Sequence, residues 1–146
     1  MVDTENLASA AVSRDILLAP VNDEPAGTDG SIGAIEDQEY VFVDSDFGFS
    51  DLEDGHGFST VSFTQLPANG QLTLVGTGVL GDAGVPLTVS VNDINSGLLR
   101  YTPPANLHGF ATTIQFAVSD DGPSGTGPNG EDHRNTDSSP LSLIHI

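Results

Sequence analysis

Clusters of carboxylates are the part of this sequence best able to do chemistry. They fall in turn-like stretches, around Asn22-Asp23, Asp51 to Asp54 and Asp120-Asp121, in a chain with 21 acidic residues against 3 basic ones and a formal net charge of −18. Carboxylates that are held close together must take up protons or bind a cation. Calcium suits them, because it accepts about 6–8 oxygen ligands from carboxylates, amides and backbone carbonyls in a flexible geometry.

A second interpretation stays open, in which the acidic residues only keep the surface hydrated and soluble. Asp51–Gly55 does not follow the spacing of an EF-hand loop, and Gly125–Asp132 does not follow the glycine-rich nonapeptide of a calcium-binding β-roll. Calcium would therefore need ligands from separate loops, which the fold has to bring together.

Short segments of alternating apolar and polar residues must position these clusters. Alternation that uses β-branched and aromatic residues predicts half-buried strands. About seven such strands, separated by turn residues, predict an all-β fold, an antiparallel β-sandwich of two sheets. The clearest segments are Glu39–Val43, Thr60–Thr64, Gln71–Leu74, Leu87–Val91, Leu98–Tyr101 and Thr113–Val118.

Local signals also predict one hairpin and one helical turn. Asn69-Gly70 favours the positive φ angles of a tight hairpin turn, so we expect Val61–Thr64 to pair with Gln71–Leu74. The stretch Val91–Gly97 predicts a single helical turn, capped by one of its first polar residues, Asn92 or Asp93.

The expected topology brings most of the acidic clusters to one end of the sandwich. The segment that enters the first strand, the loop after the second strand and the loop after the sixth strand share an end. We therefore expect Asn22-Asp23, Asp51 with Asp54, and Asp120 with Asp121 to converge there, while Glu36-Asp37 lies at the opposite end. The stretch Asp120–Pro140, which follows the last cluster, is predicted to be a long loop.

Composition and missing motifs exclude several classes of function. A charge of −18 repels phosphates and anionic membrane surfaces, which argues against nucleic acid as a partner. No apolar run approaches the roughly 18 residues of a membrane span, which argues against direct membrane insertion. The absence of Cys removes disulfides and thiolate chemistry. No nucleophile elbow, Walker loop or H-E-x-x-H motif occurs, so we expect a non-enzymatic protein. The histidines are interpreted as solvent-exposed loop or terminal residues: His56, His108, His133 and His145.

Six short motifs occur in an order that is typical of one family. They are Val21–Pro25, Glu36-Asp37, Phe47–Asp51, Leu66–Gly70, Tyr101–Pro103 and Val118–Gly122. Together they resemble a cadherin-like tandem repeat of large bacterial surface adhesins, of the VCBS and RTX-adhesin type. The resemblance covers the chain from about Val21 to Pro140.

The resemblance implies a cadherin- or immunoglobulin-like β-sandwich that binds calcium at the junctions between repeats, outside the cell, and serves adhesion and biofilm formation. Its expected partners are calcium, neighbouring repeats of the same polypeptide, and a cell-surface protein or glycan. The usual Asp-Pro-Asp-Gly of the family is one residue longer here, Asp51-Leu52-Glu53-Asp54-Gly55, which leaves open whether Asp54 or Glu53 is a ligand. The positions that match the calcium ligands are Asn22, Asp23, Glu36, Asp51, Asp54, Asp120 and Asp121.

The same resemblance divides the chain into three parts. Residues 1–21 are expected to be the last strand of a preceding repeat with its linker, and residues 22–140 to be the repeat itself. Residues 141–146 match one reading frame of a common sequencing adapter, so we interpret them as an artefact that stands in for the final strand. Either this tail or Arg14–Ala19 is expected to occupy the otherwise open sheet edge.

Two functions are compatible with these observations. The first is a calcium-stiffened spacer or adhesion module; the second is a carbohydrate- or protein-binding module, or an accessory domain of a secreted enzyme, that uses Asp120–Pro140. A sugar-binding face would carry exposed aromatic side chains. The aromatic residues outside the expected strands are interpreted as plugs over the core, which favours the spacer: Phe47, Phe49, Phe58 and Phe110.

Overall fold

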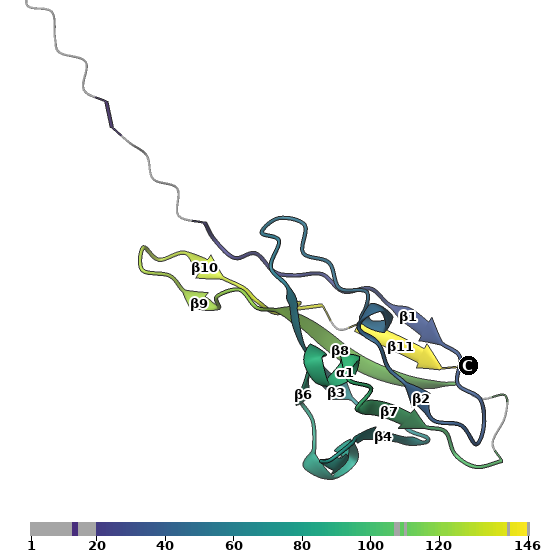
Figure 1. Ribbon diagram of the computed structural model, residues 1–146. Helices are drawn as coiled ribbons and strands as arrows, with labels where there is room; N and C mark the ends of the chain where they lie inside the picture. Colours follow the sequence, from purple (N-terminus) through teal and green to yellow (C-terminus); the bar gives the residue numbers. More distant parts are fainter. Residues whose placement is uncertain (1–12, 15–19, 107–108, 110, 140, 146) are drawn as a thin grey trace, which may run out of the picture.

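The computed structural model describes residues 13–14, 20–106, 109, 111–139 and 141–145. It confirms an all-β fold, mostly of antiparallel sheets with short helical turns (Figure 1). A five-stranded sheet has the order β1 (Gly30–Ile32), β11 (Leu141–His145), β8 (Thr112–Asp120), β3 (Phe58–Gln65) and β6 (Leu87–Ser90). A four-stranded sheet has the order β2 (Tyr40–Val41), β7 (Leu99–Thr102), β4 (Gln71–Leu74) and β5 (Gly78–Val79). The remaining elements are the hairpin of β9 (Gly125–Thr126) and β10 (Asp132–His133), and the helical turns η1 (Asp44–Phe47), η2 (Leu80–Ala83) and α1 (Val91–Asn95).

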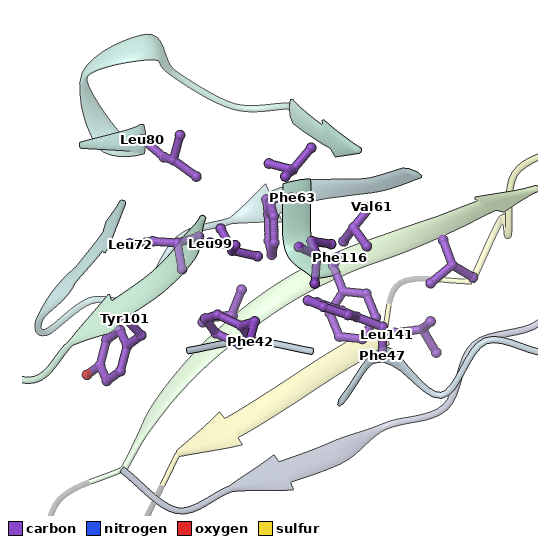
Figure 2. Packing of buried hydrophobic residues seen from close by; sticks show 14 of the residues in the cluster. Phe42, Phe47, Val61, Phe63, Leu72, Leu80, Leu99, Tyr101, Phe116 and Leu141 are labelled. Carbon is purple, nitrogen blue, oxygen red and sulfur yellow. The ribbon is translucent and has the colours of Figure 1, made fainter. Parts of the chain in front are cut away.

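One hydrophobic cluster joins side chains from both of the larger sheets (Figure 2). The alternation in β3 and β8 turns every second residue inward, because successive side chains of a strand point to opposite faces. Phe47 of η1 is fully buried at the centre, with ring centroids 5.1 Å from Phe116, 5.8 Å from Phe42 and 6.2 Å from Phe63. This aromatic packing fixes the chain before and after η1, including the segment that leads to the acidic loop at residues 51–57.

Four phenylalanines were expected outside the strands, and one of them, Phe58, lies in a strand instead. Phe58 is the first residue of β3, where it stacks on Phe49 with ring centroids 4.6 Å apart. Both rings are half-buried against the core, as expected of plugs, and Phe110 is not among the described residues.

The expected hairpin across Asn69-Gly70 is wrong. β3 pairs with β6 and β8, whereas β4 pairs with β5 and β7 in the other sheet. A type I′ turn needs positive φ at both central residues, and among the described residues Asn69 is not one of the non-glycine positions with positive φ, while Gly70 has φ +81°. After Leu66-Pro67 the chain instead crosses between the sheets, and the Tyr101 hydroxyl donates to the Asn69 carbonyl at 2.9 Å.

The helical turn is confirmed, but its cap is a different residue. α1 begins at Val91, and the hydroxyl of Ser90 accepts a hydrogen bond from the Asp93 N–H at 3.1 Å. The same hydroxyl donates to the Asp93 carboxylate at 2.8 Å. Ser90 therefore takes the N-cap position expected of Asn92 or Asp93, because the helix starts at Val91, before either of those residues could cap it.

The stretch predicted to be a long loop, Asp120–Pro140, is partly ordered as strands. β9 and β10 form an antiparallel hairpin, and Thr136 forms a further bridge with Ser119 at the end of β8. The signal was hidden because these strands are two residues long and rich in Gly and Asp.

The chain end occupies a position inside the five-stranded sheet. β11 pairs in antiparallel fashion with β8 and in parallel fashion with β1, so residues 141–145 of the tail occupy a strand position beside β8, as expected of one of the two candidate segments. The strand expected near Arg14–Ala19, in residues 1–21, lies largely outside the described residues. Among the residues that the structure describes, no helix is both long and apolar enough to cross a membrane.

Candidate functional site

Asn22 anchors the entering chain against the end of β8 and the β9–β10 hairpin. Its side-chain amide donates to the Arg134 carbonyl at 2.7 Å and lies 3.3 Å from both carboxylate oxygens of Asp120. Its backbone N–H donates to Nδ1 of His133 at 3.0 Å, and its carbonyl accepts from the Arg134 N–H at 2.9 Å. Asn22 and Asp120 are each only 2% exposed, so this polar contact is inside the protein.

Asp120 also shapes the turn at the end of β8. Its carboxylate accepts the N–H of Gly122 at 2.6 Å, and its own N–H donates to the Asn135 carbonyl at 3.0 Å. A Cβ placed on Gly122 would lie 2.5 Å from Cγ of Asn22 and closer still to its Oδ1, so only glycine fits. The Oδ1 atom of Asn22 is buried and has no hydrogen-bond partner among the described groups.

The loop at residues 51–57 is organised by the carboxylate of Asp51. This carboxylate accepts the backbone N–H of Asp54 at 3.2 Å and that of His56 at 2.8 Å. Partial loss of water would raise the pKa of Asp51, but hydrogen bonds from the backbone outweigh it and hold the pKa below its usual value. The loop is therefore closed around an ionised Asp51, with Leu52 left 92% exposed.

The same loop contacts the entering chain through two carboxyl groups. Asp54 accepts the backbone N–H of Asp23 at 2.5 Å. Glu53 forms a side-chain hydrogen bond with Asp23, and this bond, the negative charge of Asp23 and the charges of Asp54 and Asp51 raise the pKa of Glu53. The entering chain and the 51–57 loop thus bring carboxyl groups together, which disfavours the ionised form of Glu53.

Asp121 ties the loop to the end of β8. Its carboxylate accepts the Gly57 N–H at 2.8 Å, and its N–H donates to the Gly57 carbonyl at 3.0 Å. Nδ1 of His56 lies 3.5 Å from the same carboxylate. The entering chain, the 51–57 loop and the end of β8 are therefore linked in one group of side chains, the acidic cluster: Asn22, Asp23, Asp51, Glu53, Asp54, Asp120 and Asp121.

Glu36 is the one predicted site residue that lies apart. It follows β1, which runs away from the β9–β10 hairpin, in a turn where Asp37 has φ +62° (Figure 1). The structure thus gathers six of the seven predicted residues where the entering chain, the 51–57 loop and the end of β8 meet, and leaves Glu36 outside this group.

Several residues of this region were missed or misjudged from the sequence. The sequence leaves Glu53 and Asp54 as alternative ligands, yet both face Asp23. Asp54 accepts the backbone N–H of Asp23, and the side chain of Asp23 raises the pKa of Glu53. His133 is not a solvent-exposed loop residue, since it lies half-buried in β10 and accepts the Asn22 N–H. His56 is likewise half-buried beside Asp121. No sequence signal reveals such pairs, because the partners are far apart along the chain.

The acidic cluster offers only oxygen ligands, from carboxylates, an amide and backbone carbonyls, which is the donor set that calcium accepts. Most of its carboxylates are turned toward backbone N–H groups, and within the described part of the chain no three His, Cys, Asp or Glu side chains are grouped closely enough to hold a metal ion. The donor chemistry therefore suits calcium, whereas a closed coordination shell requires these side chains to turn.

Comparison with protein-family models, with curated proteins and with solved structures finds no match for the chain.

Proposed function

We propose that this protein is a calcium-binding, non-enzymatic module of the repeat type, with a cadherin- or immunoglobulin-like β-sandwich fold, that acts outside the cell in a bacterial adhesin. The observation that carries the proposal is the contact between the entering chain and the 51–57 loop, where the Asp54 carboxylate accepts the backbone N–H of Asp23. In the same place the side chain and negative charge of Asp23 raise the pKa of Glu53, as expected where carboxyl groups are crowded.

A divalent cation relieves this crowding better than a proton does. Negative charges that face one another either protonate or gain a counter-ion, and a calcium ion neutralises two of them at once. Asp23, Glu53 and Asp54 would hold the ion at the linker, with Asp51, Asp121 and the buried pair of Asn22 and Asp120 behind them. The unpartnered Oδ1 of Asn22 is a further oxygen ligand that this group can supply.

A module with calcium in this place would act as a stiff spacer between neighbours. Asn22 and Asp23 belong to the segment by which the chain enters the fold, and the other members of the acidic cluster belong to the folded body. An ion shared between the two would restrain the angle at which a preceding repeat is attached. Neighbouring repeats of the same polypeptide are therefore the expected structural partners, with a cell-surface protein or glycan as the target of the whole adhesin.

The alternative, a carbohydrate-binding module, has less support. The stretch from Asp120 to Ser139 contains no aromatic residue, and its centre is the short β9–β10 hairpin. Sugar-binding faces usually stack the ligand on an aromatic side chain.

Thermal unfolding at fixed ionic strength tests the proposal. We expect calcium to raise the melting temperature more than magnesium does, relative to chelator, because a ligand that binds only the folded state stabilises it. Asp23→Asn should remove most of the calcium-dependent increase. Glu36→Gln serves as the matched control, since it removes a charge away from the acidic cluster and should leave the increase intact. An equal response to calcium, magnesium and monovalent salt would refute the proposal.

A further inference from the structure

The sequence contains two Asn-Gly pairs in similar local contexts, Pro67-Ala68-Asn69-Gly70-Gln71 and Gly127-Pro128-Asn129-Gly130-Glu131. An asparagine that precedes glycine is open to intramolecular attack, because the following backbone nitrogen carries no side chain beyond it that blocks the approach to Cγ. The first pair lies between β3 and β4, and the second lies at the tip of the β9–β10 hairpin. The structure places the two pairs in different environments.

At Asn129, hydrogen bonds restrain both reacting groups, the side-chain amide and the nitrogen of Gly130. Its side-chain amide donates to one carboxylate oxygen of Glu131 at 2.8 Å, and its backbone N–H donates to the other at 3.0 Å. The N–H of Gly130, whose nitrogen would attack, donates to the Gly127 carbonyl at 3.0 Å. Hydrogen bonds from its own backbone and from Asn129 lower the pKa of Glu131, so this acceptor stays ionised at neutral pH.

Asn69 has none of these restraints. It is exposed, and within the described residues neither its side chain nor the Gly70 N–H forms a hydrogen bond. The Tyr101 hydroxyl donates to the Asn69 carbonyl at 2.9 Å, and that carbonyl belongs to the same peptide group as the Gly70 nitrogen. Burial raises the pKa of Tyr101, which keeps the hydroxyl protonated as a donor.

We propose that Asn69 is a site of spontaneous deamidation and that Asn129 is protected by the fold. The Gly70 nitrogen loses its proton to a hydroxide ion, which becomes water, and attacks Cγ of Asn69; Nδ2 then takes a proton from water as the Cγ–Nδ2 bond breaks, so that ammonia leaves and hydroxide is regenerated. Water then opens the resulting five-membered imide at either carbonyl, which gives aspartate or isoaspartate. The hydroxyl of Tyr101 assists the first step, because it stabilises the negative charge that the Asn69 carbonyl oxygen acquires when Gly70 is deprotonated.

The product alters the crossing between the two sheets. Deamidation adds a negative charge, and isoaspartate adds a methylene to the main chain directly before Gly70. A Cβ on Gly70 would already lie 2.6 Å from Tyr101 and from the Thr102 carbonyl, so the backbone here fits closely over a fully buried ring. Deamidation of Asn69 should therefore disturb the packing around Tyr101 and lower the melting temperature.

Peptide mapping by mass spectrometry measures both sites in the whole chain during incubation at mildly alkaline pH. In urea the two asparagines should react at similar rates, because the local contexts are alike. In the folded protein Asn69 should react at least about tenfold faster than Asn129, the factor that about 1.4 kcal/mol of barrier gives and one hydrogen bond can supply. Equal suppression of both sites by folding, or faster reaction at Asn129, would overturn the proposal.

Three variants separate the causes. Glu131→Ala should raise the rate at Asn129, since it removes both contacts that restrain that residue. Asn69→Gln should abolish the loss of melting temperature that develops during ageing, whereas Asn129→Gln should not. Tyr101→Phe should slow deamidation of Asn69 by about 2- to 10-fold, the range expected for one hydrogen bond. Faster deamidation in this variant would show that the hydroxyl only restrains the turn and would overturn its assisting role.

Discussion

Replacement of Gly122 by alanine tests the geometry on which the acidic cluster depends. The new Cβ would lie 2.5 Å from Cγ and 2.8 Å from Nδ2 of Asn22, distances at which one of the groups has to move. Gly122 has no positive φ, so the substitution adds no backbone strain and its cost is the steric displacement of Asn22. The displaced side chain would lose its hydrogen bond to the Arg134 carbonyl and its contact with Asp120.

The expected magnitude follows from what is displaced. A buried polar group that loses its partner costs about 1–3 kcal/mol, and overpacking of a buried site costs a similar amount, so we expect Gly122→Ala to lower the free energy of unfolding by about 2–4 kcal/mol. For a chain of this size that corresponds to a fall in melting temperature of roughly 5–15 °C. Urea denaturation monitored by circular dichroism measures the change, with a far-ultraviolet spectrum to verify that the variant folds.

Gly33→Ala is the matched control. Nothing lies within 4 Å of a Cβ at this position, and the backbone does not have positive φ, so the change should stay within about 0.5 kcal/mol. A double-mutant cycle adds a second check, because Gly122→Ala should cost little once Asn22 is already alanine. If Gly122→Ala unfolds at the same urea concentration as the unaltered protein, Asn22 does not occupy this position and the account of the acidic cluster is wrong.

Three further perturbations give distinct expected results. Glu53→Gln should stabilise the calcium-free protein at neutral pH, because the raised pKa of Glu53 means that folding disfavours its ionised form. This gain in stability should disappear as the pH falls through the pKa of Glu53 in the folded state toward its value in the unfolded state. A gain in melting temperature that does not depend on pH in this way would count against the crowding of Glu53 by Asp23. Phe47→Ala removes a fully buried ring between three other phenylalanines and should lower the free energy of unfolding by about 3–5 kcal/mol in urea denaturation, so a loss below 1 kcal/mol would contradict the core described above. Ser90→Ala removes the N-cap of α1 and should cost about 1 kcal/mol in the same assay, whereas Ser96→Ala, at an exposed position after the helix, should cost less.

The strand pattern could be predicted because alternation has a direct physical cause. In the middle of β3 and β8 the buried residues Val61, Phe63, Ile114, Phe116 and Val118 are apolar and most of their neighbours are polar, so the periodicity of two is visible without any knowledge of pairing. The order of these strands along the chain then brings the entering segment, the 51–57 loop and the end of β8 to one end, where Asp23 contacts Asp54 and Gly57 contacts Asp121. Whether these residues bind calcium stays a prediction.

Pairing partners and caps depend on contacts that local patterns do not encode. Asn69-Gly70 has the composition of a hairpin turn, yet the hydroxyl of Tyr101 holds the crossing between sheets in another conformation. His133 and Asn22 are separated by 111 positions, and no local signal connects them. The choice between Glu53 and Asp54 was open for the same reason, since it depends on how the additional residue of the loop is accommodated against Asp23.

Calorimetric titration of the intact chain with calcium tests the central claim most directly. We expect saturable binding that weakens as the pH falls, because the raised pKa of Glu53 makes protons compete with calcium for its carboxylate. We also expect Asp23→Asn to weaken binding and Glu36→Gln to leave it unchanged. A chain that shows no saturable heat with calcium, or that responds equally to Asp23→Asn and Glu36→Gln, would contradict the account and leave the acidic residues as a solvated surface.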